Sequence, residues 1–290
     1  MDARSIAATA VNKGFLTSAE NIDVDFTKPK YFFNKSVYDN RVYQGFGKAD
    51  TSVELKLGPN ITDWPEMVAL PENLLVKVVS LITDPVTTTD ELIPSGETSS
   101  YRSNPLGLAE FTLSRKDPAY VGRAKEVQVA EKAIEAGNCP SQAFPEVKPI
   151  MDTIKTKFTI SRDVMGIGST IFAVKPGDGS AREQAASCQK VLGGWANIAK
   201  EYATKRYRSN LINWGMLPFI FDEENLPFEN GDYVFIPQVA QGIKDKKSEF
   251  TAYVVRNGEM KEFTLKMGEL TDDEREIILA GCLINYNRNK

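Results

Sequence analysis

Residues 175–186, Lys-Pro-Gly-Asp-Gly-Ser-Ala-Arg-Glu-Gln-Ala-Ala, have the composition of an anion-binding loop. The apolar segment 169–174 before them predicts a short buried strand, and 182–191 predicts a helix. Such a junction exposes unpaired backbone N–H groups and the positive end of the helix dipole, and glycines let the backbone approach an anion. Arg182 would add a planar, two-pronged donor. Several donors aimed at an alkoxide would also allow Ser180 to act as a base.

Other interpretations of this loop remain open at the level of residue types. It lacks the terminal lysine and Ser/Thr of a Walker loop, and only Gly177 and Gly179 fit a G-x-G-x-x-G fingerprint. A tight turn in which Ser180 caps the helix explains the same residues. The Ser-x-x-Lys match at 187–190 lacks its companion motifs, and we treat it as chance.

A second candidate lies in the long polar segment 84–105, which contains Ser-Ser-Tyr-Arg-Ser-Asn-Pro at 99–105. Polar loops of this length in compact domains are more often functional than idle. Arg102 could reach into a carboxylate-binding pocket. The alternative is an ordinary solvated arginine on the surface.

The composition excludes several classes of site. There is no histidine, so a Ser–His dyad, a Cys–His dyad or a histidine metal site cannot be built within this chain. The three cysteines, Cys139, Cys188 and Cys282, are far apart and odd in number, which argues for a reducing compartment and against a disulfide framework. No pair has C-x-x-C spacing, which argues against a metal site built from this chain alone. A net charge of −4 argues against nucleic-acid binding. Without a signal peptide or an apolar run of membrane-spanning length, we expect a soluble, cytoplasmic protein with no membrane partner.

The hydrophobic patterns alternate between strands and helices, which predicts an α/β domain with a partly parallel sheet. The expected strands are 74–82, 158–160, 169–174, 196–199, 233–236, 251–255 and 262–265. The expected helices are 1–13, 124–136, 182–191, 204–214 and 272–280.

Two of these stretches together resemble the aconitase superfamily, the iron–sulfur hydro-lyases that include aconitases and isopropylmalate isomerases. Residues 177–186 resemble that family's G-x-G-S-S-R-E-H-A-A loop. Thr88-Thr-Asp90 and Tyr101-Arg-Ser-Asn104 are similar to its T-T-D-H segment and its arginine loop. Further matching segments follow in the family's order: Leu192-Gly-Gly194, Ala196-Asn-Ile-Ala199 and 210–218.

The resemblance, closest to a bacterial aconitase-like hydratase, implies the family's mobile C-terminal domain. That domain is a swivelling β/β/α fold with parallel and antiparallel strands, which we expect over residues 73–290. Residues 1–25 would then be the C-terminal remnant of a larger, cluster-bearing core, and residues 26–72 an extended connector. The chain would be a C-terminal fragment or one subunit of a split enzyme.

The resemblance also implies roles for individual residues. Ser180 would be the catalytic base, Arg102 and Arg182 would bind substrate carboxylates, and backbone amides near Ala181 would help to hold the base. Ala181 stands where the family has a second serine. Gln184 and Glu91 stand where it has histidines. These departures leave the reaction type in place and the identity of the substrate open.

The implied reaction is reversible dehydration of a tri- or dicarboxylic hydroxy acid. It would use a 4Fe–4S cluster that is ligated outside this chain, on a core domain or subunit that is the expected partner. Alone, the chain should bind no cluster and show no hydratase activity. The alternative is a non-catalytic swivel module that binds a carboxylate or regulates. A serine hydrolase is disfavoured by the absence of histidine.

Overall fold

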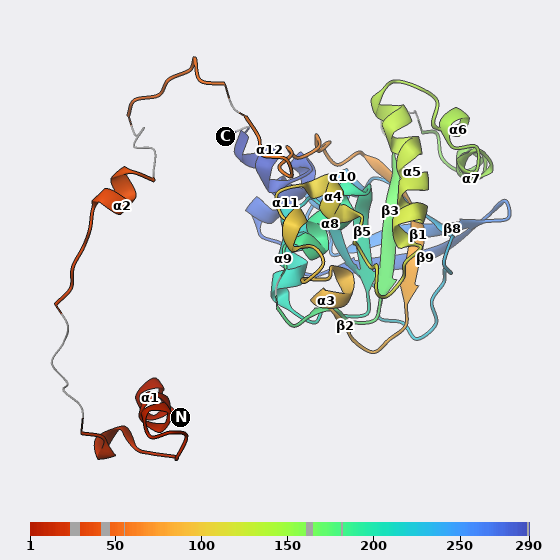
Figure 1. Ribbon diagram of the computed structural model, residues 1–290. Coiled ribbons are helices and arrows are strands. Elements are labelled where there is room, and N and C mark those ends of the chain that lie inside the picture. Colours follow the sequence, from red (N-terminus) through yellow and green to blue (C-terminus); the bar gives the residue numbers. More distant parts are fainter. Residues whose placement is uncertain (24–29, 42–46, 55, 161–164, 181, 289) are drawn as a thin grey trace. The chain divides into compact units, whose positions relative to one another are not determined.

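The computed structural model describes residues 1–290 except 24–29, 42–46, 55, 161–164, 181 and 289 (Figure 1). The chain divides into two compact units, residues 1–55 and residues 56–290. Residues 56–72, part of the predicted connector, thus belong to the larger unit. The assignment of residues 1–25 to a cluster-bearing core stays a prediction.

The smaller unit contains α1 (Ala3–Val11), the 3₁₀ turn η1 (Ala19–Asn21) and α2 (Ser36–Asp39). Helix α1 confirms the predicted helix at the start of the chain. It begins where the Asp2 carboxylate accepts hydrogen bonds from the backbone N–H groups of Arg4 and Ser5, at 2.9 and 3.0 Å. These bonds satisfy donors that the first helical turn leaves without partners.

The described part of the larger unit contains a closed barrel of seven strands in the order β1-β3-β5-β6-β9-β8-β7. Strands β1, β3, β5 and β6 run parallel, and the remaining neighbours pair antiparallel. The predicted mixture of parallel and antiparallel strands is confirmed. The bounds are β1 Asn73–Ile82, β3 Met165–Ala173, β5 Gly194–Ala199, β6 Leu217–Ile220, β7 Tyr233–Ile236, β8 Glu249–Arg256 and β9 Glu259–Met267.

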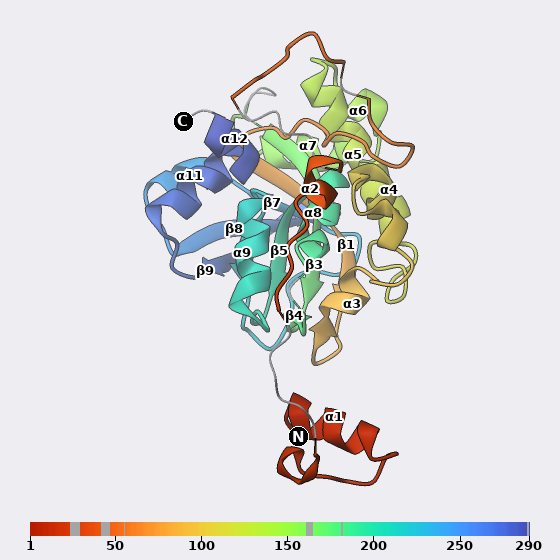
Figure 2. The same ribbon diagram turned by 60° about the vertical axis from the view of Figure 1, so that its left-hand side comes forward.

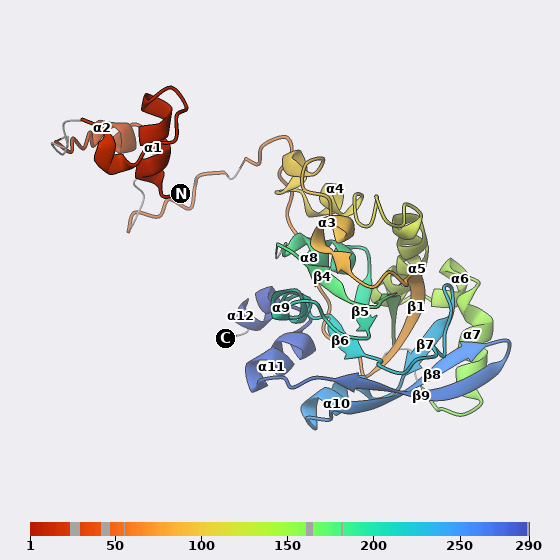
Figure 3. The same ribbon diagram turned by 90° about the horizontal axis from the view of Figure 1, so that it is seen from below.

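The β8–β9 hairpin turns at Asn257 and Gly258, whose φ angles are +52° and +79°. Positive φ at both central residues is the requirement of the two-residue turn that matches strand twist, and an Asn-Gly pair meets it best. Figure 3 shows this long hairpin with α10 (Val239–Lys244) and α11 (Asp272–Ala280) nearby.

Helices cover the parallel side of the barrel. Helix α5 (Tyr120–Glu135) lies along β3, as Figure 1 shows. Figure 2 shows α8 (Gln184–Val191) and α9 (Lys205–Asn213) beside β5. The remaining helices of this unit are α3 Thr89–Leu92, η2 Ser99–Tyr101, α4 Pro105–Ala109, α6 Pro140–Ala143, α7 Val147–Lys155 and α12 Leu283–Arg288.

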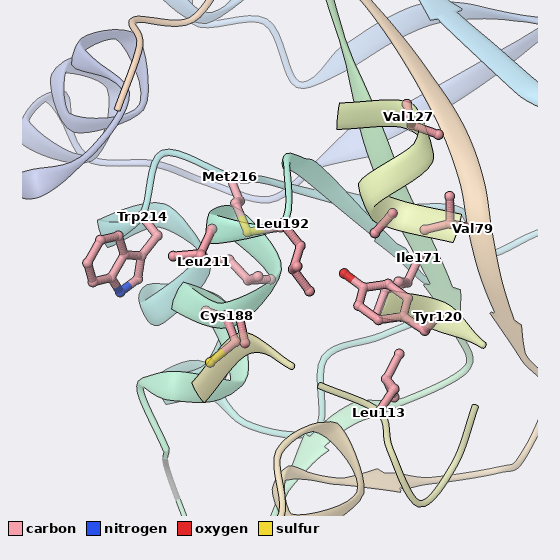
Figure 4. Close-up of a cluster of buried hydrophobic side chains, with 14 of the residues drawn as sticks. Val79, Leu113, Tyr120, Val127, Ile171, Cys188, Leu192, Leu211, Trp214 and Met216 are labelled. Atoms are coloured by element: carbon pink, nitrogen blue, oxygen red, sulfur yellow. The ribbon is translucent and has the colours of Figure 1, made fainter. Parts of the chain in front are cut away.

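Strand β1 separates two hydrophobic cores because its side chains alternate. Val76 joins a cluster that takes side chains from all seven strands and so fills the barrel. Val79 joins the other cluster, which lies under the helices and includes Tyr120, Ile171 and Cys188 (Figure 4). Burying each such side chain contributes about 1.5–3 kcal/mol. A strand buried on both faces is typical of parallel sheets covered by helices.

Some expected elements differ from the structure. The predicted strand 158–160 is wrong, because these residues are irregular. Phe158 instead packs edge-on against Phe235 and Tyr253, with ring centroids 5.2 and 5.4 Å away. Helix α8 begins at Gln184 rather than Arg182. Strand β6 was not expected, because Pro218 in its middle is a residue that sheets exclude from most interior positions.

Candidate active site

A two-stranded parallel sheet holds the glycine loop beside the Thr-Thr-Asp segment. Its strands are β2 (Thr87–Thr88) and β4 (Pro176–Asp178), in which Thr87 pairs with Pro176. The backbone N–H of Thr87 also donates to the Lys175 carbonyl at 3.0 Å. These bonds join two segments that are distant in the sequence.

Gly177 is required where it stands, for two reasons. Its φ of +90° lies in the left-handed region that side chains disfavour. A Cβ at this position would also lie 2.4 Å from side-chain atoms of Tyr207. The Gly177 carbonyl accepts a hydrogen bond from the Thr204 hydroxyl at 3.0 Å, at the start of α9. The loop is therefore fixed against α9 by close backbone approach.

Ser180 is exposed, and its carbonyl accepts a hydrogen bond from the Thr89 hydroxyl at 2.5 Å. The interpretation of Ser180 as a helix cap is wrong, because the residue before α8 is Glu183, which makes no side-chain cap. Ala181 lies outside the described residues. The hydroxyl of Ser180 therefore stands on the surface of a loop whose backbone is tied to α3.

Arg182 is three-quarters buried and reaches back to the Thr-Thr-Asp segment. Its Nη1 donates to Asp90 Oδ1 at 2.6 Å and to the Ile93 carbonyl at 2.8 Å. The hydrogen bond from Arg182 is the largest cause that lowers the pKa of Asp90. Asp90 is thus held as a carboxylate that orients the guanidinium.

Asp90 also accepts hydrogen bonds from Arg115 and Ser95. Arg115 donates from Nη1 to Asp90 Oδ2 at 2.8 Å, and from Nη2 to Glu97 Oε1 at 3.0 Å. The backbone N–H and hydroxyl of Ser95 donate to Asp90 Oδ1 at 3.2 and 3.1 Å. Sequence reasoning missed this support. Asp90 stood in a recognised motif without a role, and Arg115 stood in no motif.

Arg102 is exposed and follows η2 directly. Its loop is tethered by the segment that precedes the barrel. Thr62 N–H donates to the Ser103 carbonyl at 2.9 Å, and the Asn60 amide donates to the Ser100 carbonyl. Asn104 next to them caps α4 by accepting from Gly107 N–H at 2.8 Å.

Arg102 and Arg182 line one hollow of about 160 Å³. Its other lining residues are Ile93, Pro94, Ser95, Thr98, Leu108 and Gln184. The structure therefore brings the two arginines together and adds Gln184 to them, while their roles stay predictions. Since the hollow combines guanidinium groups with polar and apolar walls, a small carboxylate suits it.

The other departure from the family pattern, Glu91, has a structural explanation. Its Oε2 accepts from the backbone N–H of Thr88 at 2.7 Å, and the Thr88 hydroxyl accepts from Glu91 N–H at 3.2 Å. This is a capping box at the start of α3. The Thr88 backbone N–H is the largest cause that lowers the pKa of Glu91, and Lys116 also contributes.

The cysteines lie in separate elements. Cys139 precedes α6, Cys188 is in α8 and Cys282 lies between α11 and α12. Burial raises the pKa of Cys188 to about 12, which opposes formation of a metal-binding thiolate. The described residues contain no group of three or more His, Cys, Asp or Glu side chains suited to a metal ion. None of their helices is long and apolar enough to cross a membrane.

Comparison with known proteins finds similarity to aconitase-type proteins. Residues 129–224 match the Aconitase C-terminal domain. Over 126 residues the chain is 32% identical to aconitate hydratase A of Rickettsia bellii, an alignment that covers 42% of this chain and 14% of that protein. Over 114 residues it is 36% identical to the homoaconitase small subunit of Methanocaldococcus jannaschii, covering 39% and 58%.

A solved structure also resembles this chain, the 3-isopropylmalate dehydratase (leuD) of Methanocaldococcus jannaschii. The TM-score is 0.46 at 22% identity, covering 75% of this chain and 94% of that one. The alignments to the two curated relatives span less than two thirds of either relative.

Proposed function

We propose that this chain, whose residues 129–224 match the Aconitase C-terminal domain, supplies the carboxylate-binding arginines and the serine base of a hydro-lyase. The reaction is the reversible dehydration of a di- or tricarboxylic hydroxy acid. The observation that carries the proposal is the hollow shared by Arg102 and Arg182, which come from distant segments.

In this proposal the two arginines hold the substrate by its carboxylates. Arg182 uses Nη1 for its hydrogen bonds to Asp90 and to the Ile93 carbonyl. Its Nη2 and Nε would therefore contact the substrate carboxylate. Arg102 adds a second guanidinium at the same hollow. Each planar fork recognises a carboxylate in a defined orientation, and two forks fix a molecule with two carboxylates.

Ser180 is the proposed base that removes or returns the proton α to a carboxylate. Ser180 is exposed two residues before Arg182 in the sequence, and the chain has no histidine to activate it. Stabilisation of an alkoxide would come from the positive end of α8 and from the nearby guanidinium. Ser180 itself does not line the hollow. The hydrogen bond from the Thr89 hydroxyl to the Ser180 carbonyl ties its backbone to α3, the helix whose Asp90 holds Arg182.

The residues described here do not fit a 4Fe–4S cluster, because the three cysteines stand apart and no metal-binding group is present among them. No step of the proposed reaction uses a cluster held by this chain. In this proposal the cluster is held by a partner core, which is a domain or a separate subunit. The activity belongs to that assembly.

The test compares Arg102→Lys, which keeps the charge but removes the fork, with the unchanged sequence. Loss of the fork should cost about 1.5–3 kcal/mol of carboxylate binding. That equals a roughly 10- to 150-fold fall in kcat/KM in the assembled enzyme. Arg206→Lys is the matched control, because Arg206 is exposed on α9 away from the hollow's lining.

Ser180→Ala separates an enzyme from a non-catalytic carboxylate-binding module. If Ser180 is the base, the variant binds the hydroxy acid as before while turnover in the assembled enzyme falls by at least 10²-fold, the scale of general-base catalysis. Unchanged turnover would remove Ser180 from the mechanism. Unchanged affinity and turnover in Arg102→Lys would remove Arg102.

A further inference from the structure

A second hollow lies on a different side of α8. Segment 65–68, helix α5, the end of α8 and the start of β5 enclose about 190 Å³. None of the residues proposed for catalysis lines it.

Lys190 is the unusual group in this hollow. Its side chain belongs to a residue that is only 6% exposed, and its buried Nζ has no hydrogen-bond partner in the described chain. The ammonium lies 3.7 Å from the centroid of the Trp195 ring, which stabilises the charge from one side. A buried ammonium whose donors are unsatisfied is costly, so an acceptor inside the hollow would be strongly favoured.

The carboxylate of Glu131 does not satisfy Lys190. Glu131 is 8% exposed and attracts the ammonium electrostatically, yet its Oε2 accepts the backbone N–H of Ile167 at 2.6 Å. The remaining charges that line the hollow are Glu66, Lys132 and Glu135. A simple anion would face two further glutamates here. A ligand with a positive group beside its carboxylate would instead be attracted to these glutamates.

We propose that this hollow binds a small zwitterion, an α-amino acid. Its carboxylate accepts hydrogen bonds from Lys190 over the Trp195 ring. Its ammonium faces Glu66 and Glu135. The unsatisfied donor and the acidic residues on the same walls fit this class better than they fit a dianion or an apolar molecule.

Isothermal titration calorimetry of the full chain with glycine and with acetate tests the proposal. Glycine should bind at least tenfold more tightly than acetate, and Lys190→Met should lower the glycine affinity by at least tenfold. Lys205→Met is the control, because Lys205 is an exposed lysine on α9 that does not line the hollow, and it should change the affinity by less than threefold.

Fluorescence provides a readout that does not depend on the Lys190 variant. The chain has three tryptophans, and glycine should change the emission of the unchanged protein but not that of Trp195→Phe. Absence of glycine binding, equal affinities for glycine and acetate, or an unaltered Lys190→Met variant would each overturn the proposal.

Discussion

Replacement of the buried Glu131 by glutamine should change how the stability of the protein depends on pH. Burial raises the pKa of Glu131 from its ordinary value of 4.5 to about 7, although the Ile167 N–H works in the opposite direction. Between these two values the folded chain binds more protons than the unfolded chain. The free energy of unfolding therefore falls as the pH rises through this window.

The size of the effect follows from the distance between the two pKa values. At about 1.4 kcal/mol for each pH unit, Glu131 contributes a loss of about 3 kcal/mol between pH 4.5 and pH 7. Glutamine has no proton to lose and can still accept the hydrogen bond from Ile167. The difference in unfolding free energy between the natural chain and Glu131→Gln should thus shift by about 3 kcal/mol across this range.

Urea denaturation at pH 5 and at pH 8 measures this difference. Glu135→Gln is the control on the same helix, because its exposed side chain is hydrated in both the folded and the unfolded chain. A Glu131→Gln difference that stays constant within 0.5 kcal/mol, a margin of about the extrapolation error, would refute the reasoning.

Lys190 should produce the opposite slope at higher pH. Burial lowers its pKa from 10.5 to about 8, while Glu131 works in the opposite direction. Between about pH 8 and 10.5 the folded chain binds fewer protons than the unfolded chain, so stability rises with pH there. Lys190→Met should flatten this rise, and an unchanged slope in urea denaturation would contradict the assignment.

Three further changes have defined outcomes. Gly177→Ala should lower the unfolding free energy in urea by at least about 2 kcal/mol, because its Cβ meets Tyr207 at a positive φ. Asp90→Asn should weaken dicarboxylate binding, measured by calorimetry, about fivefold, a value reduced because the Arg182 pair is partly exposed. Thr88→Ala should cost about 1 kcal/mol in the same urea assay, through loss of the capping box of α3.

Local signals in the sequence were enough to define several elements. The bounds of β7 and α11 match the predicted ranges 233–236 and 272–280. Thr271 caps the start of α11, and Gly281 follows the end of the helix at a φ of +89°. Both ends of α11 are therefore marked by a local sequence signal. Pro218 argued against a strand at β6, but pairing with the neighbouring strands of the barrel outweighed that local signal.

The site was only partly predictable for a related reason. The glycine loop, Arg182 and Arg102 could be identified from motifs, since each motif is contiguous. The hydrogen bond from Arg115 to Asp90 could not be identified in this way, because it depends on where the segment after α4 meets α3. Such contacts arise from tertiary packing and leave no periodicity or spacing in the sequence.

Helix α8 explains why the two hollows have fixed walls. From Ala185 to Val191 every residue of this helix is buried, so it has no solvated face along which to tilt. Gln184 at its first position lines the arginine hollow, and Lys190 near its end lines the second. Close packing along the whole helix holds both side chains in one rigid frame.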